Sequence, residues 1–99
     1  MEVQETKLYI YLLENCRACE ILSDNLFVAL DIFKQQHPDI EININVFEIK
    51  SSEVNKYKKD NIVDFPTVKV IRNNETVHTI IGSVSKIKLL SILNDYFIK

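Results

Sequence analysis

Glycine, proline and tryptophan are scarce in this 99-residue sequence, which has one glycine, two prolines and no tryptophan. So little glycine and proline excludes a collagen-like, low-complexity or linker-rich chain. No apolar run approaches the roughly 20 residues of a membrane span, so we expect no membrane association. Positive charge is not in excess either, because the net charge is −2, and we expect no nucleic-acid binding.

The composition that remains is typical of one globular domain. Apolar residues make up 46% of the sequence and charged residues 26%. A chain of this length can bury roughly two-thirds of its unfolded surface. We expect a single, monomeric domain over residues 1–99, with residues 1–6 as a flexible extension. The polar, acidic start of the chain lacks the basic and apolar regions of a secretory signal, so we expect a cytoplasmic protein.

The two cysteines, Cys16 and Cys19, are three residues apart. This C-x-x-C spacing is typical of redox motifs, and it is also half of a four-ligand zinc site. The other half is missing, because His37 and His78 are too far apart in the sequence to supply it, and we expect no metal. Two further interpretations stay open: small core residues buried on a helix, and a shared metal or cluster site.

The sequence around the cysteines predicts a strand followed by a helix. Residues 7–13 are almost continuously apolar, as in a central strand that is covered on both faces. After them, apolar residues recur every three to four positions, which predicts a helix that ends before Pro38. Extended backwards, this apolar stripe includes Cys19 and leaves Cys16 at the exposed start of the helix. The stripe consists of Leu22, Leu26, Ala29, Leu30 and Phe33.

This position has a chemical consequence for Cys16. A helix N-terminus stabilises a thiolate through free N–H groups and the helix dipole. Arg17 adds a positive charge beside Cys16, while Glu14 and Glu20 oppose it, so we expect a moderately lowered pKa for the Cys16 thiol. In the mechanism that follows, Cys16 attacks a substrate disulfide, and Cys19 then resolves the mixed disulfide.

The middle of the chain predicts three more strands. Alternating apolar residues predict a strand over residues 40–49, and a short helix opens near Ser51. β-Branched residues predict strands over residues 67–72 and 76–81, joined by an Asn73-Asn74 turn.

The end of the chain predicts a last helix over residues 84–97, with Ser83 able to cap it. The order of elements is then β-α-β-α-β-β-α, with the first pair of strands parallel and the last pair antiparallel. The apolar side predicted for this helix consists of Ile87, Leu90, Leu93 and Phe97.

With these elements in place, the sequence resembles the thioredoxin/glutaredoxin superfamily. Three features carry the resemblance: the C-x-x-C motif after the first strand, the Phe-Pro-Thr-Val segment at residues 65–68, and residues 81–86 leading into the last helix. They occur in the family's order over residues 7–99. The resemblance implies an α/β thioredoxin fold, in which a central four-stranded mixed sheet is flanked by helices.

The resemblance also implies roles for particular residues. In the family, a cis-proline segment lies against the active-site disulfide, which implies that Pro66 is cis and lies beside Cys16. The backbone of Phe65 then faces the substrate, and Thr67 and Gly82 support the site. A chain of this kind is expected to reduce protein disulfides without a cofactor. Its electron donor is a thioredoxin reductase-like enzyme or glutathione.

The motif departs from both branches of the superfamily. Asn15 stands where thioredoxins usually have Trp, and Arg17-Ala18 replaces the Gly-Pro of thioredoxins and the Pro-Tyr of glutaredoxins. Ile10 and its neighbours are apolar, so the buried acid of thioredoxins has no clear match. Two alternatives therefore stay open: a glutathione-dependent reductase of the glutaredoxin type, and a thioredoxin-fold binding module whose cysteines are incidental.

Overall fold

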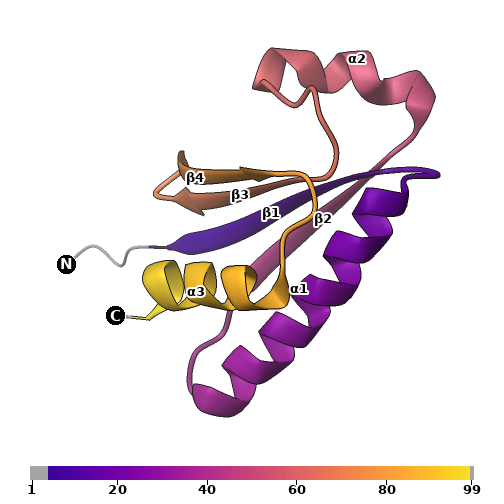
Figure 1. Ribbon diagram of the computed structural model, residues 1–99. Coiled ribbons are helices and arrows are strands. Elements are labelled where there is room, and N and C mark those ends of the chain that lie inside the picture. The colour runs from indigo at the N-terminus through magenta and orange to yellow at the C-terminus, as the bar shows by residue number, and fades with distance from the viewer. Residues whose placement is uncertain (1–4, 99) are drawn as a thin grey trace.

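The computed structural model describes residues 5–98 and confirms the α/β class. Four strands form one mixed sheet in the order β2-β1-β3-β4. Figure 1 shows α1 and α3 on one face of this sheet and α2 on the other. The elements, in chain order, are β1 (Thr6–Leu13), α1 (Arg17–Gln36), β2 (Asn43–Ile49), η1 (Ser51–Glu53), α2 (Val54–Tyr57), η2 (Lys58–Asp60), β3 (Thr67–Arg72), β4 (Glu75–Ile81) and α3 (Lys86–Phe97).

The strand β1 lies inside the sheet and pairs on both sides. It is parallel to β2 and antiparallel to β3, with Tyr11 opposite Thr67. The connection from β1 to β2 passes through α1, because parallel neighbours need a long crossover. The strands β3 and β4 form an antiparallel hairpin, and its turn residues Asn73 and Asn74 both have positive φ. The strand pairings and the turn predicted from the sequence are therefore confirmed.

The start of the described chain is more ordered than the predicted extension. The strand β1 begins at Thr6, one residue inside the range 1–6. The backbone O of Glu5 accepts a hydrogen bond from the N–H of Asn73 at 3.2 Å, which fixes Glu5 to the hairpin turn. The predicted flexibility therefore does not extend to Glu5 and Thr6, and residues 1–4 lie outside the described residues.

The strand β2 is shorter and more exposed than the alternation predicts. It begins at Asn43, because the N–H of Ile40 donates to the O of His37 at 3.1 Å and residues 37–40 form a turn. The side chains of Ile44 and Val46 stay 38% and 52% exposed. They are exposed because β2 is an edge strand, with β1 on one side only.

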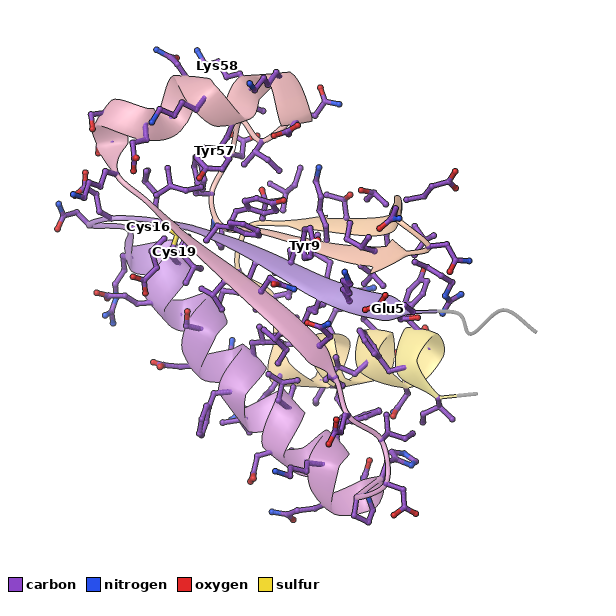
Figure 2. All side chains as sticks on the ribbon, turned by 180° about the vertical axis from the view of Figure 1, so that it is seen from behind. Glu5, Tyr9, Cys16, Cys19, Tyr57 and Lys58 are labelled. Carbon is purple, nitrogen blue, oxygen red and sulfur yellow. A yellow bond between two sulfur atoms is a disulfide. The ribbon has the colours of Figure 1, made fainter. Side chains whose placement is uncertain are left out.

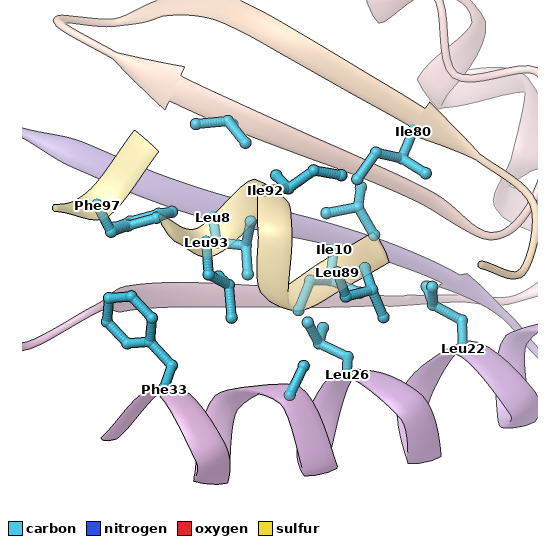
Figure 3. Packing of buried hydrophobic residues seen from close by; sticks show 13 residues of the cluster. Leu8, Ile10, Leu22, Leu26, Phe33, Ile80, Leu89, Ile92, Leu93 and Phe97 are labelled. Carbon is cyan, nitrogen blue, oxygen red and sulfur yellow. The ribbon is translucent and has the colours of Figure 1, made fainter. Parts of the chain in front are cut away.

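The main core lies between the sheet and the two helices α1 and α3 (Figure 3). The stripe predicted for α1 is confirmed, because Leu22, Leu26, Ala29 and Phe33 are buried and Leu30 packs against them half-buried. Each fully buried Leu or Phe stabilises the fold by roughly 1.5–3 kcal/mol relative to an exposed side chain. This packing fixes the direction of α1, and hence the position of the cysteines at its start. None of the helices within residues 5–98 has the length and apolar character needed to cross a membrane.

The buried face of α3 differs from the prediction. Ile87 is 80% exposed, and Leu90 is only half-buried. Because of the adjacent apolar pairs at residues 89–90 and 92–93, the sequence fits two neighbouring faces of the helix. Packing against α1 and the sheet buries the face with Leu89 and Ile92, not the one with Ile87 and Leu90. The residues that α3 buries are Leu89, Ile92, Leu93 and Phe97.

The cap of α3 also differs from the prediction. The hydroxyl of Ser85 accepts a hydrogen bond from the N–H of Lys88 at 3.1 Å, so Ser85 and not Ser83 is the N-cap residue. A Ser hydroxyl caps a helix from the residue directly before its first turn, and the helix begins later than the predicted residue 84.

A second apolar cluster lies on the opposite face of the sheet, under α2. Tyr11, Ile49 and Ile62 are buried there, and the rings of Tyr11 and Phe47 stack with centroids 4.9 Å apart. Tyr57 of α2 meets Tyr11 edge-on, and Figure 2 shows it between α2 and the sheet. The short helical segment that begins at Ser51, as predicted, is thereby held over the ends of β1 and β2.

Candidate functional site

The turn between β1 and α1 places both cysteines. Asn15 has a φ of 54°, a left-handed conformation that asparagine tolerates, and the chain turns sharply there. Cys16 is the N-cap residue of α1, with an extended backbone. Its Sγ accepts a hydrogen bond from the N–H of Cys19 at 3.1 Å, in the way that a polar side chain caps a helix. One N–H group at this helix end is therefore directed at the Cys16 sulfur.

Cys16 and Cys19 form a disulfide, with their Cα atoms 5.2 Å apart (Figure 2). Cys19 is only 4% exposed, and its Sγ accepts a hydrogen bond from the N–H of Leu13 at 3.4 Å. Cys16 is half-buried, so it is less exposed than a position at the very tip of the helix suggests. The inward orientation predicted for Cys19 is confirmed, and Cys16 is the more accessible of the two sulfurs.

Arg17 is directed along the helix surface. Its guanidinium donates to the carboxylate of Glu20 at 3.1 Å, and the two side chains are 83% and 66% exposed. An exposed pair of this kind contributes about 0–1 kcal/mol to stability. The positive charge that the sequence offers to Cys16 is therefore shared with Glu20, which comes from the next turn of the same helix.

Glu14 fastens the turn before Cys16 to the segment after β2. Its carboxylate accepts a hydrogen bond from the N–H of Ser51 at 2.6 Å, and its own N–H donates to the O of Ile49 at 3.0 Å. The hydrogen bonds from Ser51, and the charge of Lys50, hold the pKa of Glu14 below its ordinary value. No sequence pattern indicated this contact, because Glu14 and Ser51 are 37 residues apart.

A cleft of about 550 Å³ opens beside the disulfide, between the start of α1 and the end of β2. Both cysteines line it. Five of its lining residues are charged, of which four are acidic and one is basic: Glu14, Glu20, Asp24, Glu48 and Lys50. The sequence pointed to Glu14 and Glu20 through their closeness to the cysteines. It missed Glu48, which reaches the site because β2 pairs in parallel with β1 and places it opposite Leu12.

The residues singled out around the proline form a group of their own. The Phe65–Pro66 bond is cis, as the resemblance implies, and Pro66 is fully buried. The N–H of Gly82 donates to the O of Pro66 at 2.8 Å. Thr67 is buried, and its hydroxyl donates to the O of Asp64 at 2.6 Å. Gly82 has a φ of 87°, in the left-handed region that favours glycine.

The sheet places this proline group at the same edge as the disulfide. Thr67 pairs with Tyr11, two residues before the end of β1, and with Ile81 of β4. Cys16 follows the same end of β1 three residues later. Phe65, Pro66, Thr67 and Gly82 do not line the cleft described above, and neither does Arg17. The cleft therefore contains the disulfide but not the proline group, which lies at the same end of the sheet, and the predicted place of Pro66 directly beside Cys16 stays a prediction.

Each of the two histidines lies against an aromatic residue. The ring of His37, the C-cap residue of α1, lies 4.9 Å from that of Phe33. The Nδ1 of His78 lies 3.2 Å from the hydroxyl of Tyr96. Over residues 5–98, no group of three or more His, Cys, Asp or Glu side chains is arranged to hold a metal ion.

Solved structures with the same architecture are numerous. Thioredoxin f2 of Chlamydomonas reinhardtii is 17% identical, with a TM-score of 0.67, and the match covers 93% of this chain and 79% of that one. This chain has the thioredoxin fold. Thioredoxin-2, a component of malaria parasite protein secretion machinery, matches at 14% identity and a TM-score of 0.64, over 96% of this chain and 86% of that one.

A third solved structure with the thioredoxin fold is oxidised thioredoxin from Plasmodium falciparum. It is 20% identical, with a TM-score of 0.65, and the match covers 94% of this chain and 82% of that one. No family model and no curated protein matches the sequence. Within the thioredoxin fold, the disulfide of this chain occupies the junction between a central strand and its helix, as the apolar run before the cysteines and the apolar stripe after them predict.

Proposed function

We propose that this protein is a thiol-disulfide oxidoreductase that reduces protein disulfides. One observation carries the proposal: an accessible cysteine caps α1, and its disulfide partner is buried one turn further along the same helix. The cap position stabilises the thiolate of Cys16 when the disulfide is reduced. The burial of Cys19 keeps it in reserve as the resolving thiol.

The reaction that this arrangement supports has two exchange steps. The Cys16 thiolate attacks one sulfur of the substrate disulfide, and the other substrate sulfur leaves as a thiolate that takes up a proton. Cys19 then loses its proton and attacks the Cys16 sulfur, which releases the second substrate thiol. The substrate gains two electrons and two protons, and the protein becomes the Cys16–Cys19 disulfide.

A polypeptide is the substrate class that we propose. Support comes from Phe65, which lies two residues before β3 and whose side chain packs in the apolar cluster under α2. A backbone segment that is held in place in this way, outside the paired strands, can pair with an extended chain as an added strand. A protein segment makes more of these backbone hydrogen bonds than a tripeptide such as glutathione.

A thioredoxin reductase-like enzyme is the electron donor that we propose. The solved structures compared above are thioredoxins, and this likeness supports a thioredoxin-type partner. Glutathione is the competing donor, and the experiment below distinguishes the two.

The test is reduction of insulin with dithiothreitol as the donor, followed by the turbidity of the released chains. We expect turnover in the wild type and none above background in Cys16→Ser or Cys19→Ser. Background rates in all three proteins contradict an enzyme and favour a binding module. NADPH oxidation with thioredoxin reductase, compared with glutathione and glutathione reductase, then identifies the donor. Faster recycling by glutathione contradicts the proposed donor.

A further inference from the structure

The cleft beside the disulfide carries a concentrated negative charge. Four carboxylates against one ammonium leave three net negative charges among its lining residues, whereas the whole chain has a net charge of −2. The negative charge is therefore gathered around this one cleft instead of being spread evenly over the molecule. Clefts lined by one sign of charge attract ligands of the opposite sign and accelerate their arrival.

Two of the four carboxylates already have partners. Glu20 pairs with Arg17, and Glu14 accepts the hydrogen bond from Ser51 and lies in the field of Lys50. Within residues 5–98, no Lys, Arg or His side chain forms an ion pair with Asp24 or Glu48. The uncompensated charge of the cleft therefore comes from these two exposed side chains.

Asp24 and Glu48 reach the cleft from two different elements. Asp24 is on α1, about two helical turns after Cys16, and Glu48 is the penultimate residue of β2. Both line the cavity that contains Cys16 and Cys19. A substrate whose disulfide reaches Cys16 therefore comes close to both carboxylates. The substrate comes to this cleft because its disulfide reacts with Cys16. The carboxylates then interact with the groups that flank the substrate disulfide.

We propose that Asp24 and Glu48 are specificity-determining residues, which select disulfides flanked by positively charged groups. In proteins, such substrates are disulfide-bearing segments rich in lysine or arginine. This inference rests on the proposed function, because it concerns the substrates of the same exchange reaction. The chemical step is unchanged: Cys16 forms the mixed disulfide, Cys19 resolves it, and the substrate gains two electrons and two protons.

Three small disulfides test the proposal: cystamine, which is cationic, dithiodiglycolate, which is anionic, and neutral bis(2-hydroxyethyl) disulfide. Reduced protein is mixed with each one, and the oxidised protein is quantified by mass spectrometry after acid quenching. Each rate is divided by the rate of the same disulfide with dithiothreitol, because the leaving thiols differ in pKa. At low ionic strength, we expect a normalised cystamine-to-dithiodiglycolate ratio of about ten in the wild type, which falls toward one in high salt.

The variant Asp24→Asn/Glu48→Gln isolates the two carboxylates. We expect it to lower the ratio by at least about threefold. The matched control Asp39→Asn/Glu41→Gln removes the same total charge from exposed residues between α1 and β2, at the far end of the sheet from the disulfide, and we expect it to keep the wild-type ratio. Equal ratios in all three proteins overturn the proposal. Failure of the wild type to react with the neutral disulfide overturns the proposed function itself, and the inference with it.

Discussion

The carboxylate of Glu14 accepts a hydrogen bond from the N–H of Ser51 at 2.6 Å, and this contact joins the turn before Cys16 to the segment after β2. These two parts are 37 residues apart in the sequence, and the pairing of β2 with β1 brings them near each other. Because the bond is made to the ionised carboxylate, it lowers the pKa of Glu14 and depends on pH.

Replacement of Glu14 tests this link through acid stability. A carboxylate whose pKa is lowered in the folded state adds stability above its unfolded pKa of about 4.3, and this stability is lost as the pH falls through the folded value. We expect Glu14→Ala to be less stable than the wild type at pH 7, with a difference that shrinks as the pH is lowered toward 2. Urea denaturation at a series of pH values measures this difference in the free energy of unfolding.

The control for Glu14 is Glu41→Ala, which removes an exposed carboxylate at the other end of β2. Glu14→Gln keeps an acceptor oxygen and is expected to lie between the wild type and Glu14→Ala. A difference between wild type and Glu14→Ala that stays constant with pH contradicts an ionised acceptor.

The two thiols of the reduced protein should differ in reactivity. Cys16 is half-buried at the helix cap, whereas Cys19 is 4% exposed. We therefore expect iodoacetamide at neutral pH to alkylate Cys16 at least about tenfold faster, because alkylation follows thiolate fraction and access. Peptide mass spectrometry after brief labelling locates the modification. Preferential labelling of Cys19 contradicts the assigned roles, as does failure of Cys19→Ser to trap a substrate at Cys16.

The pair formed by Arg17 and Glu20 should act on Cys16 as two opposing charges. Removal of Arg17 leaves Glu20 alone near the helix start, so Arg17→Ala should raise the pKa of the Cys16 thiol. Glu20→Gln should lower it, and the double variant should return close to the wild type. Thiolate absorbance during a pH titration provides the values. If the pKa of the Cys16 thiol in both single variants equals that in the wild type, the helix N-terminus alone sets this pKa and the two charges do not contribute.

Replacement of Gly82 should lower the free energy of unfolding through its backbone conformation alone. Its φ is 87°, and a Cβ added there meets no heavy atom within 4 Å. The cost of Gly82→Ala therefore comes from the backbone, and we expect a loss of about 1–2 kcal/mol in the free energy of unfolding. Gly82→Asn should lose less, because asparagine tolerates positive φ. Urea denaturation compares the three proteins, and equal losses in both variants contradict the conformational explanation.

Tyr11 should limit stability at alkaline pH. Burial, followed by the charge of Asp60, raises the pKa of the Tyr11 phenol. The neutral phenol then favours the folded state below the unfolded pKa of about 10, and this stability is lost as the pH rises through the folded value. We expect Tyr11→Phe to lose less stability than the wild type between pH 9 and 11. The control is Tyr9→Phe, on the same face of the sheet, and an equal effect of both changes contradicts the assignment.

The sequence predicted the structure well where apolar residues recur with a clear period and where the contacts are between residues close together in the chain. The apolar stripe of α1 predicted the burial of Cys19, and β1 and the hairpin followed from continuous or β-branched runs. The buried face of α3 was only partly right: Leu93 and Phe97 are buried as predicted, but Leu89 and Ile92 are buried in place of Leu90 and Ile87, because two adjacent apolar pairs fit either side of the helix. The cis bond at Pro66 was implied by the resemblance and not by local propensity, since a trans bond is the default for proline.

The contacts that shape the site beyond the cysteines are long-range. Ser51 reaches Glu14, and Glu48 reaches the cleft, only because β2 pairs in parallel with β1 after a 20-residue helix. In a hairpin, the type of turn sets the register of the two strands. Parallel strands are joined by a long crossover, so no turn indicates their register. The place of Glu48 in the cleft was therefore beyond prediction from the spacing of residues along the chain.

The central place of β1 sets an order of events during synthesis. Both cysteines follow β1 immediately, but β3, which completes the pairing of β1, begins 48 residues after Cys19. At about 5–20 residues per second, the ribosome needs roughly 2–10 s to produce that stretch. During this time the sheet that covers Cys19 cannot close, and the thiol that is inaccessible in the finished protein is open to exchange on the growing chain.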